Sequence, residues 1–254
     1  MTVRQRVGAL LLGGLVCIMA DASVWGYEEV TVLEGGTLSG RVTLSGATPL
    51  PHQFELRRSP DRTFCGAPSD GSGYRLLREV AVDARGGLKD VVVTIEGIDK
   101  GKPFQLHEAK IEANICQFVP FVSVIRDRHP FTVTNLDPVA HDLQVYERDE
   151  DHVFIMFHRP SLTKTGTTDH IRFAAGRREM TMQCGMHPFM QAHGLAVENP
   201  YYAVTGHDGG FTITQIPPGT YRVRIWHPAI GIQEQQVTIA AQADEKLDVA
   251  LSSR

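Results

Sequence analysis

Residues 184–190 read Cys-Gly-Met-His-Pro-Phe-Met, and this stretch decides how the rest of the chain is interpreted. It places a thiol, an imidazole and a thioether on one short loop, from Cys184, His187 and Met190. Soft sulfur ligands combined with imidazole are typical of copper sites in proteins. The stretch therefore predicts a metal-binding loop, provided that a further imidazole reaches it from elsewhere in the fold.

That further imidazole is His141, which follows a predicted strand at 131–134. Trigonal copper sites hold a thiolate and two imidazoles in one plane, with a weak thioether above the plane. A short loop between two strands can supply three of these ligands, and the fourth then comes from across the sandwich. We predict that one copper ion per chain is bound by His141, Cys184, His187 and Met190. Zinc is possible in principle, but this donor set suits copper better.

Period-two alternation of apolar and polar residues dominates the chain and predicts β-strands. The strand-like segments are 37–44, 131–134, 143–146, 211–214 and 221–225, together with a more fully apolar run at 91–95. Turn-forming residues separate them, as at Asp208-Gly209-Gly210 and Pro217-Pro218-Gly219. No run with a helical period exceeds about 10 residues. We therefore predict an all-β chain built from β-sandwiches.

The segment around the ligand motif resembles the cupredoxin family of plastocyanin and azurin. The resemblance covers roughly 110–199, from the strand at Phe131 through Asn135 and His141 to the Cys-x-x-His loop. It implies a Greek-key β-sandwich with a mononuclear type 1 copper site. The gap from His187 to Met190 is two residues, shorter than in plastocyanin or azurin, so Gln191 stays open as an alternative axial ligand.

Two polar residues beside the ligands are expected to support them. Ligand-holding loops generally need hydrogen bonds from neighbouring groups. Asn135 and Asp142 are the candidates, with Asn135 preferred.

A second resemblance is split between two stretches on either side of this segment. Gly40 and Val42, then Asp208-Gly209-x-Phe211, then Pro217-Pro218-Gly219-x-Tyr221 resemble the carboxypeptidase regulatory-like (transthyretin-like) β-sandwich. The predicted divisions are a signal peptide at 1–22, regulatory-like strands at 30–103, the copper domain at 104–199 and the remaining regulatory-like strands at 200–254. Whether the copper domain is inserted into the other sandwich, or the two lie in series, stays open.

The N-terminus resembles a secretory signal, with Arg4 and Arg6 before an apolar run over 7–19 and small residues around Ala22. An uncleaved membrane anchor is the alternative, although the run is short for a membrane span. We therefore expect a periplasmic or secreted protein with no stable membrane span in its mature chain.

Export determines how the remaining cysteines are interpreted. If Cys184 binds copper, Cys65 and Cys116 are left as the oxidised pair, and we predict a disulfide between them. Two separate thiols are the alternative.

A metal site with no open position for a substrate favours a one-electron carrier, and no nucleophile triad points to an enzyme. The expected partner is an exported cytochrome or oxidase, docking where Pro188 and Phe189 surround an exposed edge of His187.

The formal charge of −4, with no basic run, excludes nucleic acid. Copper storage or delivery is the alternative function, and a carbohydrate- or protein-binding module is a weaker one, since Trp226 is the only tryptophan expected within a fold.

Overall fold

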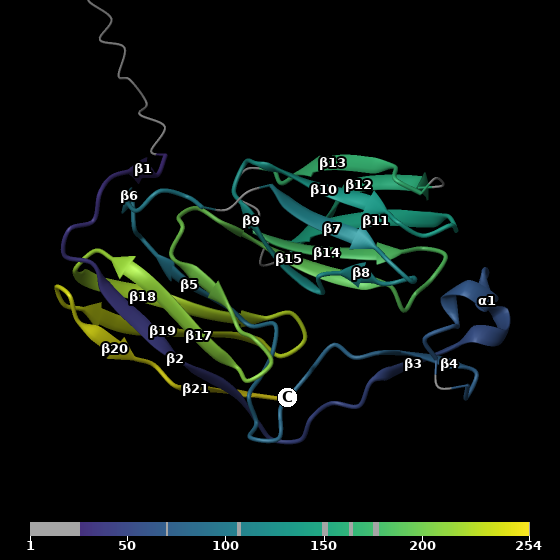
Figure 1. Cartoon of the computed structure of the whole chain (residues 1–254), viewed down its shortest axis with the longest axis horizontal. Coiled ribbons are helices and arrows are strands. Elements are labelled where there is room, and N and C mark those ends of the chain that lie inside the picture. Colours follow the sequence, from purple (N-terminus) through teal and green to yellow (C-terminus); the bar gives the residue numbers. More distant parts are fainter. Residues whose placement is uncertain are drawn as a thin grey trace, which may run out of the picture.

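The computed structural model describes residues 26–69, 71–105, 108–148, 152–162, 165–174 and 178–253. The predicted signal peptide at 1–22 lies outside these residues. Within them the chain is almost entirely β-structure in two packed sandwiches, which confirms the predicted fold class (Figure 1). No helix in the described part of the chain is both long and apolar enough to cross a bilayer.

The sandwich formed by strands from both ends of the chain is called the split sandwich. One of its sheets has the order β16-β5-β18-β19, and in the other β17 and β20 flank β2, which also pairs with β21. The strands are β2 (Gly36–Ser45), β5 (Val92–Glu96), β16 (Tyr202–Val204), β17 (Gly210–Ile216), β18 (Gly219–His227), β19 (Gly231–Ile239), β20 (Asp244–Lys246) and β21 (Val249–Ser252).

The pairing of β2 with β17 and of β5 with β18 joins strands that precede and follow the central segment. Gly209 helps to close the turn before β17, because its φ of +76° falls in the region that glycine adopts without strain. A β-carbon there would also collide with the Val42 carbonyl oxygen. The domain boundaries at 103 and 199 stay a prediction.

The intervening strands form the central sandwich, whose sheets have the orders β13-β10-β7-β8 and β12-β11-β14-β15-β9. Several connections cross between its sheets, such as β9 to β10 and β12 to β13, as in Greek-key sandwiches, whereas β14 and β15 are neighbours in one sheet. The strands are β7 (Ala109–Ala113), β8 (Phe118–Val119), β9 (Val122–Arg126), β10 (Pro130–Asn135), β11 (His141–Arg148), β12 (Val153–Leu162), β13 (Thr168–Arg172), β14 (Glu179–Cys184) and β15 (Gln191–Val197). Inward-facing residues such as Phe131, Leu143 and Met182 are fully buried between the sheets.

The two sandwiches pack against each other through an apolar contact and an ionic edge. Val124 and Leu195 of the central sandwich meet Val92 and Trp226 of the split sandwich. At the edge, Glu96 pairs with Arg178 at 2.8 Å and also with Arg222 at 2.7 Å.

Two small sheets and two short helical turns complete the described structure: β1 (Glu28–Glu29) with β6 (Lys100–Gly101), β3 (His52–Glu55) with β4 (Tyr74–Leu77), the 3₁₀ turn η1 (Leu56–Arg58) and the helix α1 (Arg62–Cys65). The sequence pattern gave no sign of α1. Residues 56–66, between β3 and β4, are called the cap. Figure 1 shows the β3–β4 pair and α1 at one end of the molecule, beyond the ends of the central strands.

Candidate metal centre

The predicted ligand loop is the tight connection between β14, which ends at Cys184, and β15, which begins at Gln191. The backbone N–H of Met190 donates to the His187 carbonyl at 2.9 Å, and that of Cys184 donates to the Met190 carbonyl at 3.2 Å. Gly185 N–H donates to the Asp142 carbonyl at 2.9 Å, tying the loop to β11. These bonds fold the loop back on itself, so Cys184, His187 and Met190 lie at one end of the central sandwich.

Three of the four predicted ligands converge in a buried triangle. The two Nδ1 atoms of His141 and His187 are 3.3 Å apart. The Sγ of Cys184 lies 3.9 Å from the Nδ1 of His141 and 3.6 Å from that of His187. All three side chains are at most 2% exposed. The strand pairing positions them, because His141 starts β11 and Cys184 ends the neighbouring strand β14.

The size of this triangle fits a transition-metal ion. A point equidistant from the three atoms lies about 2.1 Å from each, close to the ~2.0–2.3 Å at which imidazole nitrogen and thiolate sulfur bind zinc. Copper(I) and copper(II) take similar bond lengths to these donors. The side chains therefore offer a trigonal donor set without rearrangement.

The hydrogen bonds at the far side of each ring direct both Nδ1 lone pairs into the triangle. The Nε2 of His141 lies 2.9 Å from the Asp137 carboxylate, which only accepts hydrogen bonds when ionised. The Nε2 of His187 lies 3.3 Å from the carbonyl oxygen of Pro60, which is also an acceptor only. Each Nε2 therefore carries the proton in the neutral ring, which leaves Nδ1 unprotonated.

Asp137 is a functional residue that the sequence reasoning did not single out. It is 1% exposed, and besides His141 it accepts the backbone N–H groups of Ile115 at 2.6 Å and Cys116 at 2.8 Å. Its position four residues before His141 was the available signal. A buried carboxylate with these three donors orients His141 and ties it to the turn that carries Cys116.

Asn135 holds the turn that presents Asp137 and His141. Its side-chain amide donates to the carbonyls of Val139 and Leu162, both at 2.9 Å, and its oxygen accepts the Asp137 N–H at 2.9 Å. These contacts fix the turn before His141, and the role of Asn135 in supporting a bound metal stays a prediction.

Asp142 contributes through its backbone and not through its carboxylate. Its carbonyl accepts the Gly185 N–H, whereas its carboxylate oxygens accept from Gln144 and His158, both at 2.9 Å. Because side chains alternate along β11, that carboxylate points away from the buried triangle.

Burial sets the protonation of the donor atoms. It lowers the pKa of His141, against the raising effect of Asp137, and it lowers the pKa of His187, with the His141 ring acting in the same direction. Burial also raises the pKa of the Cys184 thiol, opposed by hydrogen bonds from the backbone near Met186. At neutral pH both imidazoles are therefore neutral, and a metal ion must displace the thiol proton.

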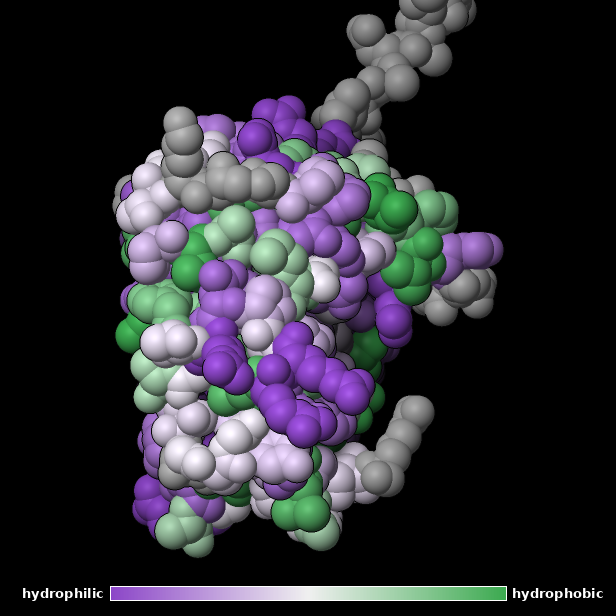
Figure 2. Space-filling view, turned by 90° about the vertical axis from the view of Figure 1, so that its right-hand side faces the viewer, coloured by the Kyte–Doolittle hydropathy of each residue, from purple (hydrophilic) through white to green (hydrophobic). Residues whose placement is uncertain are grey.

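The cap covers the edge of His187 that was expected to be exposed, so that expectation was wrong. The His187 Nε2 lies 3.3 Å from Pro60 O, 3.8 Å from Asp61 Oδ2 and 3.5 Å from Cys65 Sγ. The ring is 0% exposed as a result. Figure 2 views the molecule from the end where the cap lies in Figure 1, and strongly hydrophilic residues gather in the middle of that face.

A disulfide holds the cap in place. It joins Cys65, the last residue of α1, to Cys116 in the turn between β7 and β8, as predicted. Cys184 is the free cysteine among the described residues and is buried.

A buried arginine reinforces the same junction. The Arg75 guanidinium, 3% exposed, donates to the carbonyls of Cys65 at 2.7 Å and Ile115 at 2.9 Å. Its Cζ also lies 5.4 Å from the centre of the Phe189 ring on the ligand loop.

Met190 is fully buried in the same core cluster as Cys184 and Phe189. The Gln191 side chain is more exposed, and its amide donates to the Pro188 carbonyl at 3.3 Å. This contact directs Gln191 along the outside of the loop.

Comparison with known families identifies the C-terminal part of the chain. Residues 194–252 match the family model of the carboxypeptidase regulatory-like domain. This match confirms the resemblance drawn from Asp208-Gly209 and Pro217-Pro218-Gly219. No curated protein matches the chain.

Solved structures similar to this chain include a purple cupredoxin from Nitrosopumilus maritimus, with 20% identity, a TM-score of 0.30 and coverage of 35% of this chain and 100% of that one. A copper-containing nitrite reductase from Thermus scotoductus SA-01 has 18% identity, a TM-score of 0.30 and coverage of 39% and 24%, respectively. A single-residue mutant of amicyanin in the Cu(I) form has 15% identity, a TM-score of 0.28 and coverage of 41% and 98%. At these TM-scores, the assignment of the site depends on the side chains of this chain alone.

Proposed function

We propose that the central sandwich is a mononuclear type 1 copper domain that carries single electrons. The observation that carries this proposal is the buried triangle of Cys184 Sγ with the Nδ1 atoms of His141 and His187. One thiolate and two imidazoles, with a nearby thioether, form the donor set of blue copper sites.

Electron transfer is favoured over catalysis because the metal-donor side chains are enclosed and held in fixed positions. His141, Cys184, His187 and Met190 are each at most 2% exposed, so no substrate reaches the donor atoms. When bound, copper would supply a one-electron couple. Asp137 and Pro60 fix the two rings, and the loop hydrogen bonds fix Cys184, so the donor set changes little between oxidation states.

Export is part of the proposal, with the signal peptide at 1–22 and a periplasmic or secreted location. The Cys65–Cys116 disulfide supports it, because structural disulfides persist mainly in oxidising compartments. The partner would be an exported cytochrome or oxidase, and the chain would have no catalytic activity of its own.

The deciding experiment is to add one equivalent of Cu(II) to the purified mature chain and record visible absorption and electron spin resonance. An intense thiolate charge-transfer band with a small copper hyperfine splitting is expected for an electron carrier. Copper binding without that band would favour storage or delivery, a function that the enclosing cap also suits. Failure to bind copper would refute both functions.

Asp137→Asn should weaken copper binding about 10- to 100-fold, the usual effect of removing a hydrogen-bond partner of a metal-bound histidine. The carboxylate accepts hydrogen bonds from His141, Ile115 and Cys116, but an asparagine amide has one acceptor oxygen and one donor NH₂ group. At least one of the three N–H groups would then face the NH₂ group and lose its hydrogen bond. Competition with a copper chelator measures the change. Asp142→Asn is the matched control, and equal weakening in both variants would contradict the role of Asp137.

Met190→Leu should change the copper spectrum and raise the reduction potential, because a weak axial thioether is replaced by a side chain with no donor atom. Gln191→Leu should leave both unchanged, since its amide is directed to Pro188. Visible spectra and cyclic voltammetry of the two variants test the assignment. A spectral change confined to Gln191→Leu would assign the axial position to Gln191.

A further inference from the structure

The cap blocks one route by which a partner protein could exchange electrons with the proposed copper site. The edge of His187 that faces away from the donor triangle is closed by Pro60, Asp61 and Cys65. A partner protein therefore cannot contact that ring. Any docking surface must approach the ligand loop from another side.

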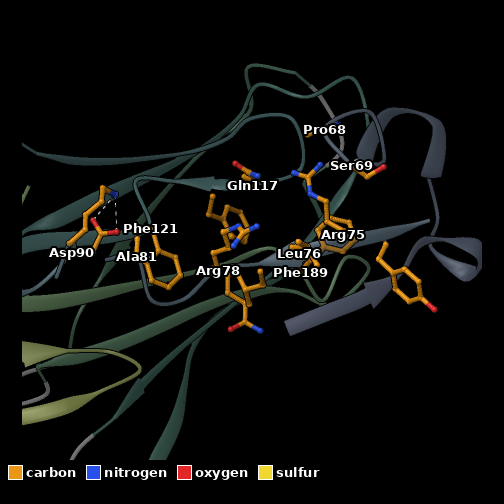
Figure 3. Close-up of a pocket in the computed structure, with 15 residues that line it drawn as sticks. Pro68, Ser69, Arg75, Leu76, Arg78, Ala81, Asp90, Gln117, Phe121 and Phe189 are labelled. Atoms are coloured by element: carbon orange, nitrogen blue, oxygen red, sulfur yellow. Dashed lines mark hydrogen bonds and ion pairs between the residues drawn. The ribbon is translucent and has the colours of Figure 1, made fainter. Parts of the chain in front are cut away.

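A cavity of about 480 Å³ opens beside the other side of the ligand loop (Figure 3). Its walls come from β4 and the residues that follow it, from the segment before β5, and from Phe121, which immediately precedes β9. Phe189 and Gln191 bring the ligand loop itself into the lining. Figure 3 shows Arg75 beside Phe189, as their 5.4 Å separation requires, and Arg78 further along the same cavity.

Phe189 connects this cavity to the donor atoms. It stands between His187 and Met190 in the sequence, and its ring centre lies 5.7 Å from that of His187. Phe189 and Gln191 both line the cavity, so a molecule seated there would lie directly against the ligand loop.

The charge of the cavity is positive, although the chain as a whole carries −4. Arg75, Arg78 and Lys89 line it together with a single carboxylate, Asp90. Lys89 and Asp90 neutralise each other through an ion pair at 2.8 Å. Arg75 is held by two carbonyl groups and has no carboxylate within hydrogen-bond distance among the described residues.

Arg78 is the group with unused binding capacity. It is exposed, and within the described residues it makes no hydrogen bond or ion pair. A guanidinium offers five donors in a planar fork that matches a carboxylate. The buried Asp137 attracts the Arg75 guanidinium electrostatically, so Arg78 is the cation of the cavity that is free to bind an incoming anion.

We propose that this cavity is the docking site for the redox partner, and that the partner is an acidic protein that presents a carboxylate side chain to Arg78. The inference rests on the proposed electron-carrier function. Electron exchange at this site forms and breaks no bond and moves no proton: the reduced site loses one electron, and a one-electron oxidant gains it. Complementary charge would raise the rate of encounter more than the final affinity.

Two small oxidants of opposite charge test the proposal on the copper-loaded full-length mature protein. The anionic probe is hexacyanoferrate(III), and the cationic probe is tris(phenanthroline)cobalt(III). Stopped-flow absorbance follows the oxidation of the reduced protein at low ionic strength. Arg78→Gln should slow the reaction with the anionic probe about three- to tenfold, leave the cationic probe unslowed, and lose this difference at high salt.

Arg172→Gln is the matched control, because it removes the same charge from an exposed position on β13, outside the lining of the cavity. Equal slowing by both substitutions would show that only net charge matters and would overturn the docking site. An unchanged rate in Arg78→Gln would overturn it as well. If the copper-loaded parent protein is not oxidised by either probe, the electron-carrier function fails, and the docking proposal fails with it.

Discussion

Cys184→Ser should abolish the thiolate charge-transfer band and lower the affinity for copper by more than about a hundredfold. The thiolate is the softest and most strongly bound donor of the set, and a serine hydroxyl stays protonated and binds copper weakly. Two imidazoles alone remain, from His141 and His187. Visible absorption after copper addition, and competition with a chelator for Cu(I), measure the two effects.

The same variant separates a metal site from a packing role for Cys184. Serine is close to cysteine in size, and the disulfide is untouched, so stability without copper should fall by only about 1–2 kcal/mol for a buried hydroxyl. Copper addition is expected to raise the free energy of unfolding of the parent protein and to leave that of Cys184→Ser unchanged. A band retained by Cys184→Ser would mean that another thiol binds the copper, and the proposed site would be wrong.

The local part of the site could be predicted from the sequence because its geometry is short-range. Cys184, His187 and Met190 lie on one hairpin loop, whose length limits how far apart the side chains can be. His141 could be added because a strand pattern placed it at a strand end. The alternation of apolar residues likewise predicted the strand at 143–146, which lies within β11 beside His141, since period two buries one face of a strand.

The cap could not be predicted, because it depends on contacts between residues far apart in the chain. Cys65 and His187 meet across 122 residues, and Pro60 meets the same ring across 127. Residues 56–66 have no strong periodicity, so nothing local indicated where they would pack. The position of His187 on the ligand loop therefore suggested an exposed ring edge. Its observed burial moves the expected docking surface to another side of the loop.

Asp137 shows a different limit. Its spacing before His141 was visible, but an aspartate in a loop is usually solvated. Only the fold shows that it is buried with three hydrogen-bond donors, two of them from the turn that carries Cys116. The sequence indicated Asp142 instead, and the direction of that side chain on β11 argues against its carboxylate as a support for the ligands.

The replacement of both Cys65 and Cys116 by alanine should lower the free energy of unfolding by about 4 kcal/mol. The disulfide spans 51 residues of sequence, and closing a loop of that size in the unfolded chain accounts for this amount. Urea denaturation of the metal-free protein measures the change. A loss below about 1 kcal/mol would show that the bond does not constrain the unfolded chain.

This variant also tests the cap as a cover for the site. Cys184 is retained, so the charge-transfer band should persist, but the rate of copper loss to a chelator should rise, because α1 is no longer tied to the turn at Cys116. Arg75 still bridges Cys65 and Ile115 through their carbonyls, so the cap should loosen without detaching completely. Adding Arg75→Met to the double variant should then accelerate copper loss further, and an unchanged rate in both would show that the cap does not control access to the copper.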